Sequence, residues 1–275
     1  MALVTKAHAY GNDFLLIPDR KERRQGVPVD RADNSRLPDL ARAVCHRHQG
    51  IGADGLILFR LRERGASMRL LNADGSWSEL SGNGLRCLAA LVARTQNLEA
   101  GTTITVDTEA GVKALDLLAR NGERYEFRAA MGTPEELRQV EIPVLGETIT
   151  ASVLRVGNPQ CIVLGPLPNP ERFGALGPAL STHPMFPAGT NVEFVEVDAP
   201  DRIRILIWER GVGPTTSSGT GSSASAVAAA AHGGAGRAID VIAPGGIQHV
   251  EWTEAGVYLT GWAEIVLEGQ WLGGR

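Results

Sequence analysis

Two predicted helices, apolar on all sides, dominate the hydrophobic pattern of the chain. Small and apolar residues run through positions 85–93, with Arg86 as the one charged residue, and again through 222–231. A helix without a polar face is buried on every side, so both should lie inside their domains. Each begins with a serine followed by a glycine-rich turn: Ser81-Gly82-Asn83-Gly84 and Ser218-Gly219-Thr220-Gly221. The chain therefore contains an internal repeat.

Short apolar runs typical of strands surround both predicted helices. In the first half they cover residues 3–9, 14–18, 56–61, 67–71, 102–107, 112–118 and 125–129. In the second half they cover residues 149–156, 161–164, 192–197, 202–208, 239–242, 247–252, 257–259 and 264–268. The pattern predicts an α+β fold in which a mainly antiparallel sheet wraps around one central helix, twice.

Two further helices and one loop complete the pattern. Prolines start helices near residues 38–50 and 170–180, the first with His46, Arg47 and His48 in its last turn. Gly233-Gly234 should end the second central helix, and the charged stretch 20–36 is expected to be a surface loop.

The repeated serine-glycine turns are candidate anion sites. The first backbone N–H groups of a helix lack partners and lie at the positive end of its dipole, so they attract carboxylates. A serine at this place is also an ordinary helix cap, which is the better interpretation of one isolated copy. Duplication favours a site, as do Asn72 and Glu209, each nine positions before its serine, and the Gly-Asn pairs at 11–12 and 157–158. We expect both helix starts to face one interdomain cleft that holds a small carboxylate substrate.

Composition narrows the class of protein. A length of 275 residues with 43% hydrophobic residues suits two medium domains, and a net charge of −4 provides no basic face for nucleic acid. No apolar run approaches the ~18 residues of a membrane span, and the N-terminus lacks a secretory signal, so we expect a cytoplasmic protein. Cys45, Cys87 and Cys161 have neither disulfide nor zinc spacing and are expected to be reduced and buried, with no metal bound.

The sequence resembles the diaminopimelate epimerase family, a group of cofactor-independent amino-acid racemases and epimerases. The resemblance runs along the whole chain and rests on its short motifs. These are GNDF (11–14), GIGADG (50–55), NADGS (72–76), GNGLRC (82–87), GNP (157–159), TNVEF (190–194), ERGVG (209–213) and GTG (219–221).

The resemblance implies two pseudo-symmetric domains, residues 1–127 and 128–263, with the C-terminal strand 264–275 returning to complete the first. It implies epimerisation at the α-carbon of an amino acid such as LL-diaminopimelate, in lysine and peptidoglycan biosynthesis, without a cofactor. A small amino acid is then the expected partner, and the oligomeric state stays open, with a homodimer as one option.

The resemblance also implies a catalytic thiol at each helix start, and here the chain departs from the family. Both positions are serine, Ser81 and Ser218, and Gln160 stands where the family usually has histidine. A thiol is readily converted to thiolate at a helix N-terminus, whereas a hydroxyl needs a strong base beside it. Glu209 remains as that base. A deliberate exchange of both cysteines would also give these serines, but Gln160 and the neighbouring serines at 217, 222 and 223 favour natural divergence.

The substrate-binding positions of the family are retained almost intact, with Gln160 as the departure. By resemblance, they fall on side chains and backbone groups at Asn12, Asn72, Gly82, Asn83, Asn158, Gln160, Asn191, Arg210, Gly219 and Thr220. Fixed amides and one arginine suit a ligand with ammonium and carboxylate groups at both ends. Any single asparagine could instead bond its own loop, but the full set favours a binding site.

Three functions remain open at this point. The first, which we favour, is an epimerase or related isomerase in which Ser81, Ser218 and Glu209 handle the proton. The second is a lyase or dehydratase acting on a related amino acid with Glu209 as its base. The third is an amino-acid-binding protein that has lost catalysis.

Overall fold

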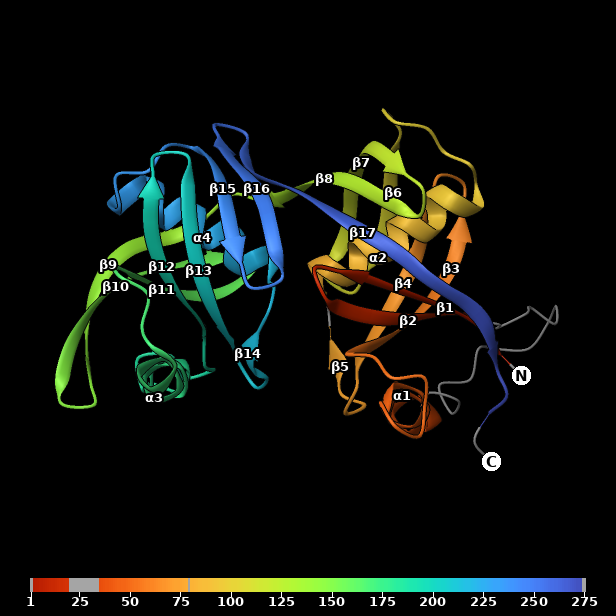
Figure 1. Ribbon diagram of the computed structural model, residues 1–275, viewed down its shortest axis with the longest axis horizontal. Helices are drawn as coiled ribbons and strands as arrows, with labels where there is room; N and C mark the ends of the chain where they lie inside the picture. The colour runs from red at the N-terminus through yellow and green to blue at the C-terminus, as the bar shows by residue number, and fades with distance from the viewer. Residues whose placement is uncertain (1, 20–34, 79, 274–275) are drawn as a thin grey trace. The chain divides into compact units, whose positions relative to one another are not determined.

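The computed structural model describes residues 2–19, 35–78 and 80–273, and the chain divides into two compact units (Figure 1). The first unit runs to Phe127 and is completed by the segment from Trp262 onward, and the second is Arg128–Gly261. The predicted loop 20–36 lies almost entirely outside the described residues. None of the helices in the described part of the chain has the length and hydropathy that a bilayer crossing needs.

The first unit is a curved sheet around helix α2. Its elements are β1 (Ala2–Ala9), β2 (Asn12–Pro18), α1 (Leu37–Cys45), β3 (Gly55–Arg62), β4 (Gly65–Asn72), β5 (Trp77–Ser78), α2 (Gly82–Thr95), β6 (Thr103–Thr108), β7 (Gly111–Asn121) and the start of β8 (Arg124–Gly132). Helix α2 packs against β1, β2, β3, β4, β6 and β7, which explains why eleven consecutive residues from Asn83 to Ala93 are buried.

The second unit repeats this plan around helix α4. Its elements are β9 (Glu135–Val144), β10 (Glu147–Val156), β11 (Asn158–Leu164), α3 (Pro170–Ser181), β12 (Asn191–Ala199), β13 (Arg202–Glu209), β14 (Gly213–Thr215), α4 (Gly219–His232), β15 (Ala238–Ala243), β16 (Gly246–Thr253) and β17 (Gly256–Trp271). Helix α4 is rich in alanine, and its short side chains let the strands lie close to its axis.

Strand pairing shows that the repeat is structural. In the first unit β2 runs parallel to β3, with Phe14 opposite Gly55, and in the second β11 runs parallel to β12, with Gln160 opposite Asn191. Each parallel pair is followed by an antiparallel neighbour, β4 or β13. The predicted fold class is confirmed: a mainly antiparallel sheet wraps around a central helix in each unit.

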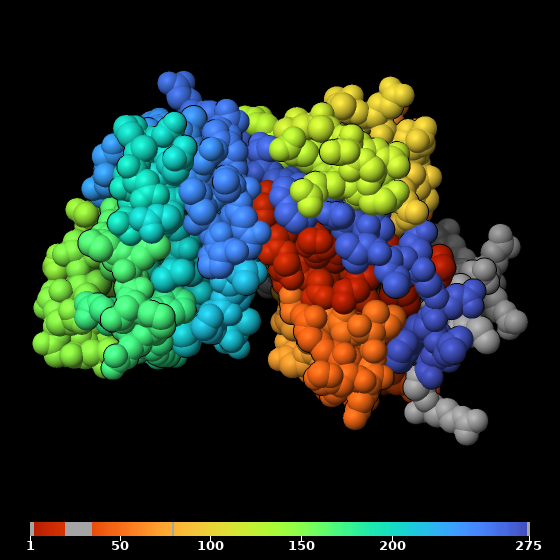
Figure 2. Space-filling view, in the orientation of Figure 1, coloured from red at the N-terminus to blue at the C-terminus, as the bar shows by residue number. Residues whose placement is uncertain are grey.

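Strand β17 leaves the second unit and ends in the first. Its early residues pair with β16, and its later residues pair with β1 from His8 opposite Glu264 to Ala2 opposite Trp271. Figure 2 shows this neighbourhood as the blue end of the chain beside the red β1 and β2. The hydrophobic pattern predicted two strands here, at 257–259 and 264–268, whereas the structure has one.

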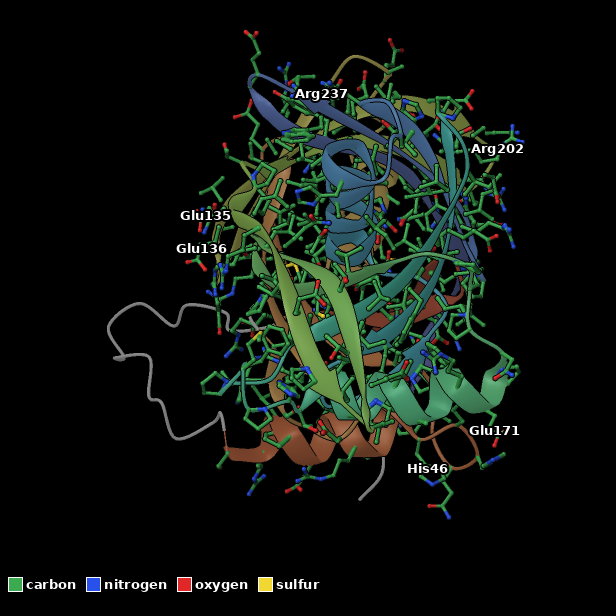
Figure 3. The ribbon with its side chains drawn as sticks, turned by 90° about the vertical axis from the view of Figure 1, so that its left-hand side faces the viewer. His46, Glu135, Glu136, Glu171, Arg202 and Arg237 are labelled. Carbon is green, nitrogen blue, oxygen red and sulfur yellow. The ribbon has the colours of Figure 1, made fainter. Side chains whose placement is uncertain are left out.

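One other local prediction needs correction, and one strand was missed. Helix α1 ends at Cys45 because His46 is extended, and its ring Nδ1 accepts the N–H groups of His48 and Gln49 at 3.2 and 3.0 Å. The histidines therefore follow the helix instead of forming its last turn. Strand β9 was not predicted, because its first residues are exposed and polar; Figure 3 shows Glu135 and Glu136 at its start pointing outward.

Candidate active site

Ser81 caps helix α2. It is extended (φ −130°, ψ 123°), and its Oγ accepts the N–H of Gly84 at 3.2 Å. The N–H groups of Gly82 and Asn83 come earlier in the helix and can reach no carbonyl within it. One helix start therefore provides both the predicted serine cap and the predicted N–H donors.

A hydrogen-bonded chain of side chains supports this helix start. The buried Arg86 donates to Asn83 Oδ1, Asn83 Nδ2 donates to Asn12 Oδ1 at 3.1 Å, and Asn12 Nδ2 donates to Asp54 Oδ2 at 2.8 Å. Arg86 also lies over the ring of Tyr10. Burial lowers the pKa of Arg86 and raises the pKa of Tyr10. Asn12 and Asn83 are thus brought together, and Arg86 and Asp54 are members of the cluster that the sequence did not assign.

Asn72 occupies a different position. It ends β4, and its Nδ2 donates to Ser76 Oγ at 2.9 Å, while Ser76 bonds to Asp74 within the same turn. The side chain therefore stabilises its own turn, which is the alternative interpretation of a single asparagine. Asn72 is exposed, and its contact with substrate stays a prediction.

Ser218 caps helix α4 in the same way. It is extended (φ −139°, ψ 124°), and its Oγ accepts the N–H of Gly221 at 3.1 Å. Its Oγ also lies 3.5 Å from Thr220 Oγ1. Gly219 and Thr220 supply the earlier N–H groups of this helix start, as Gly82 and Asn83 do for α2.

Glu209, Arg210 and Asn191 meet at the ends of two paired strands. Asn191 begins β12 and Glu209 ends β13, and Asn191 Oδ1 accepts the backbone N–H of Arg210 at 2.9 Å. The Arg210 guanidinium donates to the carbonyl of Ala188 at 2.7 Å. Asn191 therefore fixes the backbone directly after Glu209, and the structure gathers these three predicted residues.

Asn158 and Gln160 lie on β11, and a carboxyl group that the sequence did not assign lies beside them. The side-chain amide of Gln160 contacts Asn158 Oδ1 and also approaches the Glu193 carboxyl. Glu193 is fully buried, and burial, followed by the charge of Glu209, raises its pKa well above the usual range. The available signal was a glutamate among apolar residues in the TNVEF motif.

The cysteines have no place in this chemistry. All three are buried and unpaired, and burial raises the pKa of Cys45 and Cys161 to about 12. Among residues 2–19, 35–78 and 80–273, no group of three histidine, cysteine, aspartate or glutamate side chains could hold a metal ion. The polar groups available are two hydroxyls at helix starts, a carboxyl at the end of β13 and a set of amides.

The fold has solved relatives among differently named proteins. A hydroxyproline epimerase from Agrobacterium vitis, with trans-4-hydroxy-L-proline bound, is similar with a TM-score of 0.68 and 17% identity over 98% of this chain and 90% of that one. A phenazine biosynthesis protein of the PhzF family from Bacillus anthracis gives 0.66 and 15% identity over 98% and 99%. These similarities define the fold class: paired units, each a sheet around a helix.

Sequence similarity then gives the family. The diaminopimelate epimerase profile matches residues 4–136 and 152–266. The diaminopimelate epimerase of Desulforudis audaxviator is 42% identical over 98% of both chains, and that of Synechocystis is 35% identical over 97% of both. The chain belongs to the diaminopimelate epimerase family, and the predicted assignment as a pyridoxal-phosphate-independent epimerase is confirmed. The roles of individual site residues stay predictions, as does the expectation that both helix starts act on one substrate.

Proposed function

We propose that this protein inverts the α-carbon of a diaminopimelate stereoisomer, with Ser81 and Ser218 as its proton-transfer groups and Glu209 as the supporting base. The observation that carries the proposal is the pair of serine-capped helix starts, one in each unit. Whole-length identity to diaminopimelate epimerases supports the choice of substrate. Lysine and peptidoglycan biosynthesis, a cytoplasmic location and a homodimer follow as predictions from that choice.

The proposed chemistry is a proton exchange with inversion. One group takes the α-proton, the electron pair of the broken C–H bond is delocalised into the substrate carboxylate, and the second group delivers a proton to the opposite face. The carboxylate charge that develops is largest near the transition state, where the N–H groups of Gly82, Gly219 and Thr220 can stabilise it. Asn12, Asn158, Asn191 and Arg210 would hold the substrate's remaining polar groups.

The serines make the proton transfer slow. A hydroxyl becomes a base only when a second group takes its proton, and in the second unit Glu209 ends the strand beside the helix start. A thiolate at the same place would be a ready base. We therefore expect a low rate that rises with pH as the base loses its proton.

Exchange of the substrate α-proton in heavy water tests this function. NMR would follow the α-proton signal of each diaminopimelate stereoisomer with wild type, Ser81→Cys, Ser218→Cys and the double variant. We expect slow exchange in wild type and faster exchange in each cysteine variant. Ser67→Cys on β4 is the matched control and should leave the rate unchanged.

Other outcomes would favour the alternative functions. Exchange in the double variant but in none of the wild-type reactions would favour a binding protein. Loss of ammonia or water from the substrate would favour a lyase or dehydratase. Wild-type exchange that survives Glu209→Gln would show that Glu209 is not the base.

A further inference from the structure

The two helix starts rest on different side chains, although the units share one plan. Beneath α2, a Cβ added at Gly84 would lie 3.1 Å from Ile57 and 3.4 Å from Phe14. Beneath α4, a Cβ at Gly221 would collide with the Glu193 carboxyl. In the matching strand pairs, Ile57 and Glu193 lie at equivalent positions, two residues after Gly55 and Asn191, and Phe14 corresponds to Gln160. The second unit thus has a polar pair where the first has an apolar one, so the fold itself does not require these polar groups.

In the part of the chain that the structure describes, no cation lies among the charges that act on Glu193. It is fully buried on β12, and the titratable groups that act with it are Glu209 on β13 and Cys161 on β11. A buried carboxylate without a cation is costly, and a second negative charge increases the cost. These surroundings favour a neutral carboxylic acid.

Gln160 can match either protonation state of Glu193. In one orientation, its carbonyl oxygen lies 3.0 and 3.1 Å from the two Glu193 oxygens and its Nε2 donates to Asn158, which requires a proton on Glu193. In the turned orientation, Nε2 donates to Glu193 and the oxygen accepts from Thr220 Oγ1 at 3.2 Å. The same oxygen then faces Asn158, whose amide must turn as well so that its nitrogen donates. An ionised Glu193 is therefore compatible only with the turned amide, whereas the first orientation requires the neutral acid.

The orientation of the Gln160 amide also determines how Thr220 interacts with Ser218, because Thr220 Oγ1 lies 3.5 Å from Ser218 Oγ. When the Gln160 Nε2 faces Thr220, the threonine proton is left to point toward Ser218 Oγ. When the Gln160 oxygen faces Thr220, that proton is engaged, and Thr220 can only accept from Ser218. In the first arrangement, Ser218 Oγ accepts two hydrogen bonds, one from the Gly221 N–H and one from the Thr220 hydroxyl. Two donors stabilise negative charge on that oxygen.

We propose that Glu193 is a positioning residue that is protonated in the resting protein and, through Gln160 and Thr220, makes the side chain at position 218 a hydrogen-bond acceptor. The inference deepens the proposed function and rests on the role assigned there to Ser218. The neutral acid keeps a second donor aimed at the group that must hold charge after giving its proton to the substrate. Ionisation of Glu193 would reverse the hydrogen bond and oppose that charge.

The Ser218→Cys variant gives a readout that does not depend on turnover. Its thiolate can be titrated by ultraviolet absorbance, because burial keeps the native thiols protonated well above neutral pH. Adding Thr220→Val should raise the pKa of the introduced thiol by about one unit, since a hydrogen bond to a charged group is worth about tenfold or more. Adding Glu193→Gln should leave it unchanged, because a neutral amide replaces a neutral acid.

Either of two titration results would overturn the inference. A Thr220→Val variant with an unchanged thiol pKa would mean that the chain does not reach position 218. A marked fall with Glu193→Gln would mean that Glu193 carries a negative charge. Failure of the proposed function is a separate result: no α-proton exchange in any variant would reject the function, whatever the thiol titration gives.

The pH profile of wild-type exchange supplies the second readout. The rate should fall at high pH as Glu193 ionises, and Glu193→Gln should remove this falling limb. Glu147→Gln, which changes an exposed carboxylate paired with Arg172, is the matched control and should keep the limb. A falling limb that survives Glu193→Gln would contradict the inference.

Discussion

Two buried carboxyl groups near the strand ends have opposite electrostatic surroundings. Asp13 on β2 accepts from Lys6 at 2.9 Å and from Arg47 at 3.0 Å, whereas the charge that acts on Glu193 is the negative one of Glu209. Burial alone would raise the pKa of Asp13, but the two cations outweigh it and the pKa is lowered. The GNDF and TNVEF motifs drew attention to both stretches, yet the partners of each acid depend on residues brought together only by folding.

Glu193→Gln should stabilise the protein at neutral pH. The pKa of Glu193 is raised in the folded state, so the folded protein keeps a proton that the unfolded chain releases above about pH 4.3. Wild type then loses up to about 1.4 kcal/mol per pH unit between that value and the folded pKa. Urea unfolding from pH 4 to 8 should show a growing advantage for the variant, and parallel curves would contradict the raised pKa.

Asp13→Asn should have the opposite pH dependence. The lowered pKa of Asp13 means that its ion pairs stabilise the fold above the unfolded pKa of about 3.9, and that this contribution is lost as pH falls through the folded value. The variant should be less stable than wild type at pH 6, and the gap should close in acid. Thermal unfolding at a series of pH values measures it; a constant gap would indicate a packing defect instead.

At the scale of elements, short sequence motifs predicted where helices begin better than they predicted where helices end or which strands pack against them. Ser81 and Ser218 are N-caps as expected, and Pro170 starts α3 after Asn169, whose side chain accepts from Arg172 N–H. The end of α1 depended on the ring of His46, and β9 shows little apolar alternation, so neither was visible in the pattern. The side chains that pack beneath each helix start belong to strands that are distant in sequence. They could therefore not be predicted from the residues around the helix start.

Substituting alanine for Gly84 and for Gly221 compares how easily the side chains beneath the two helix starts can move. Alanine favours a helix by about 1 kcal/mol over glycine, but at Gly221 its methyl would press on the enclosed Glu193 carboxyl. We expect Gly221→Ala to lower the free energy of unfolding by about 2 kcal/mol, a typical cost of overpacking. Gly84→Ala meets the terminal methyl of Ile57, which can shift, and should cost less. Equal losses in chemical denaturation would mean that Glu193 yields as easily as Ile57.

At the scale of the whole molecule, the sequence revealed the internal repeat. The hydrophobic pattern did not reveal that β17 pairs with strands of both units. The two apolar helices and their caps indicated two similar units. The family resemblance alone implied that the C-terminal strand returns to the first unit. That this strand is continuous from Gly256 was not predicted, because Trp262 and Glu264 interrupt its apolar pattern without ending the strand. Pairing with β1 keeps it extended, and the Trp262 N–H donates to Tyr10 Oη at 3.2 Å.

A substitution late in β17 should therefore weaken the first unit selectively. Ile265 is 6% exposed, pairs with Ala7, and donates its N–H to the carbonyl of Glu123, whereas the next residue, Val266, is 50% exposed. Ile265→Asp would bury a carboxylate in the first unit, while Val266→Asp places the same charge in solvent because successive strand residues face opposite sides. Hydrogen exchange read by mass spectrometry should accelerate in β1 and β2 for Ile265→Asp, remain slow in β12 and β13, and change little for Val266→Asp. Equal acceleration in both units would mean that they unfold as one cooperative body, since loss of the β1 pairing would then be transmitted to strands that make no contact with it.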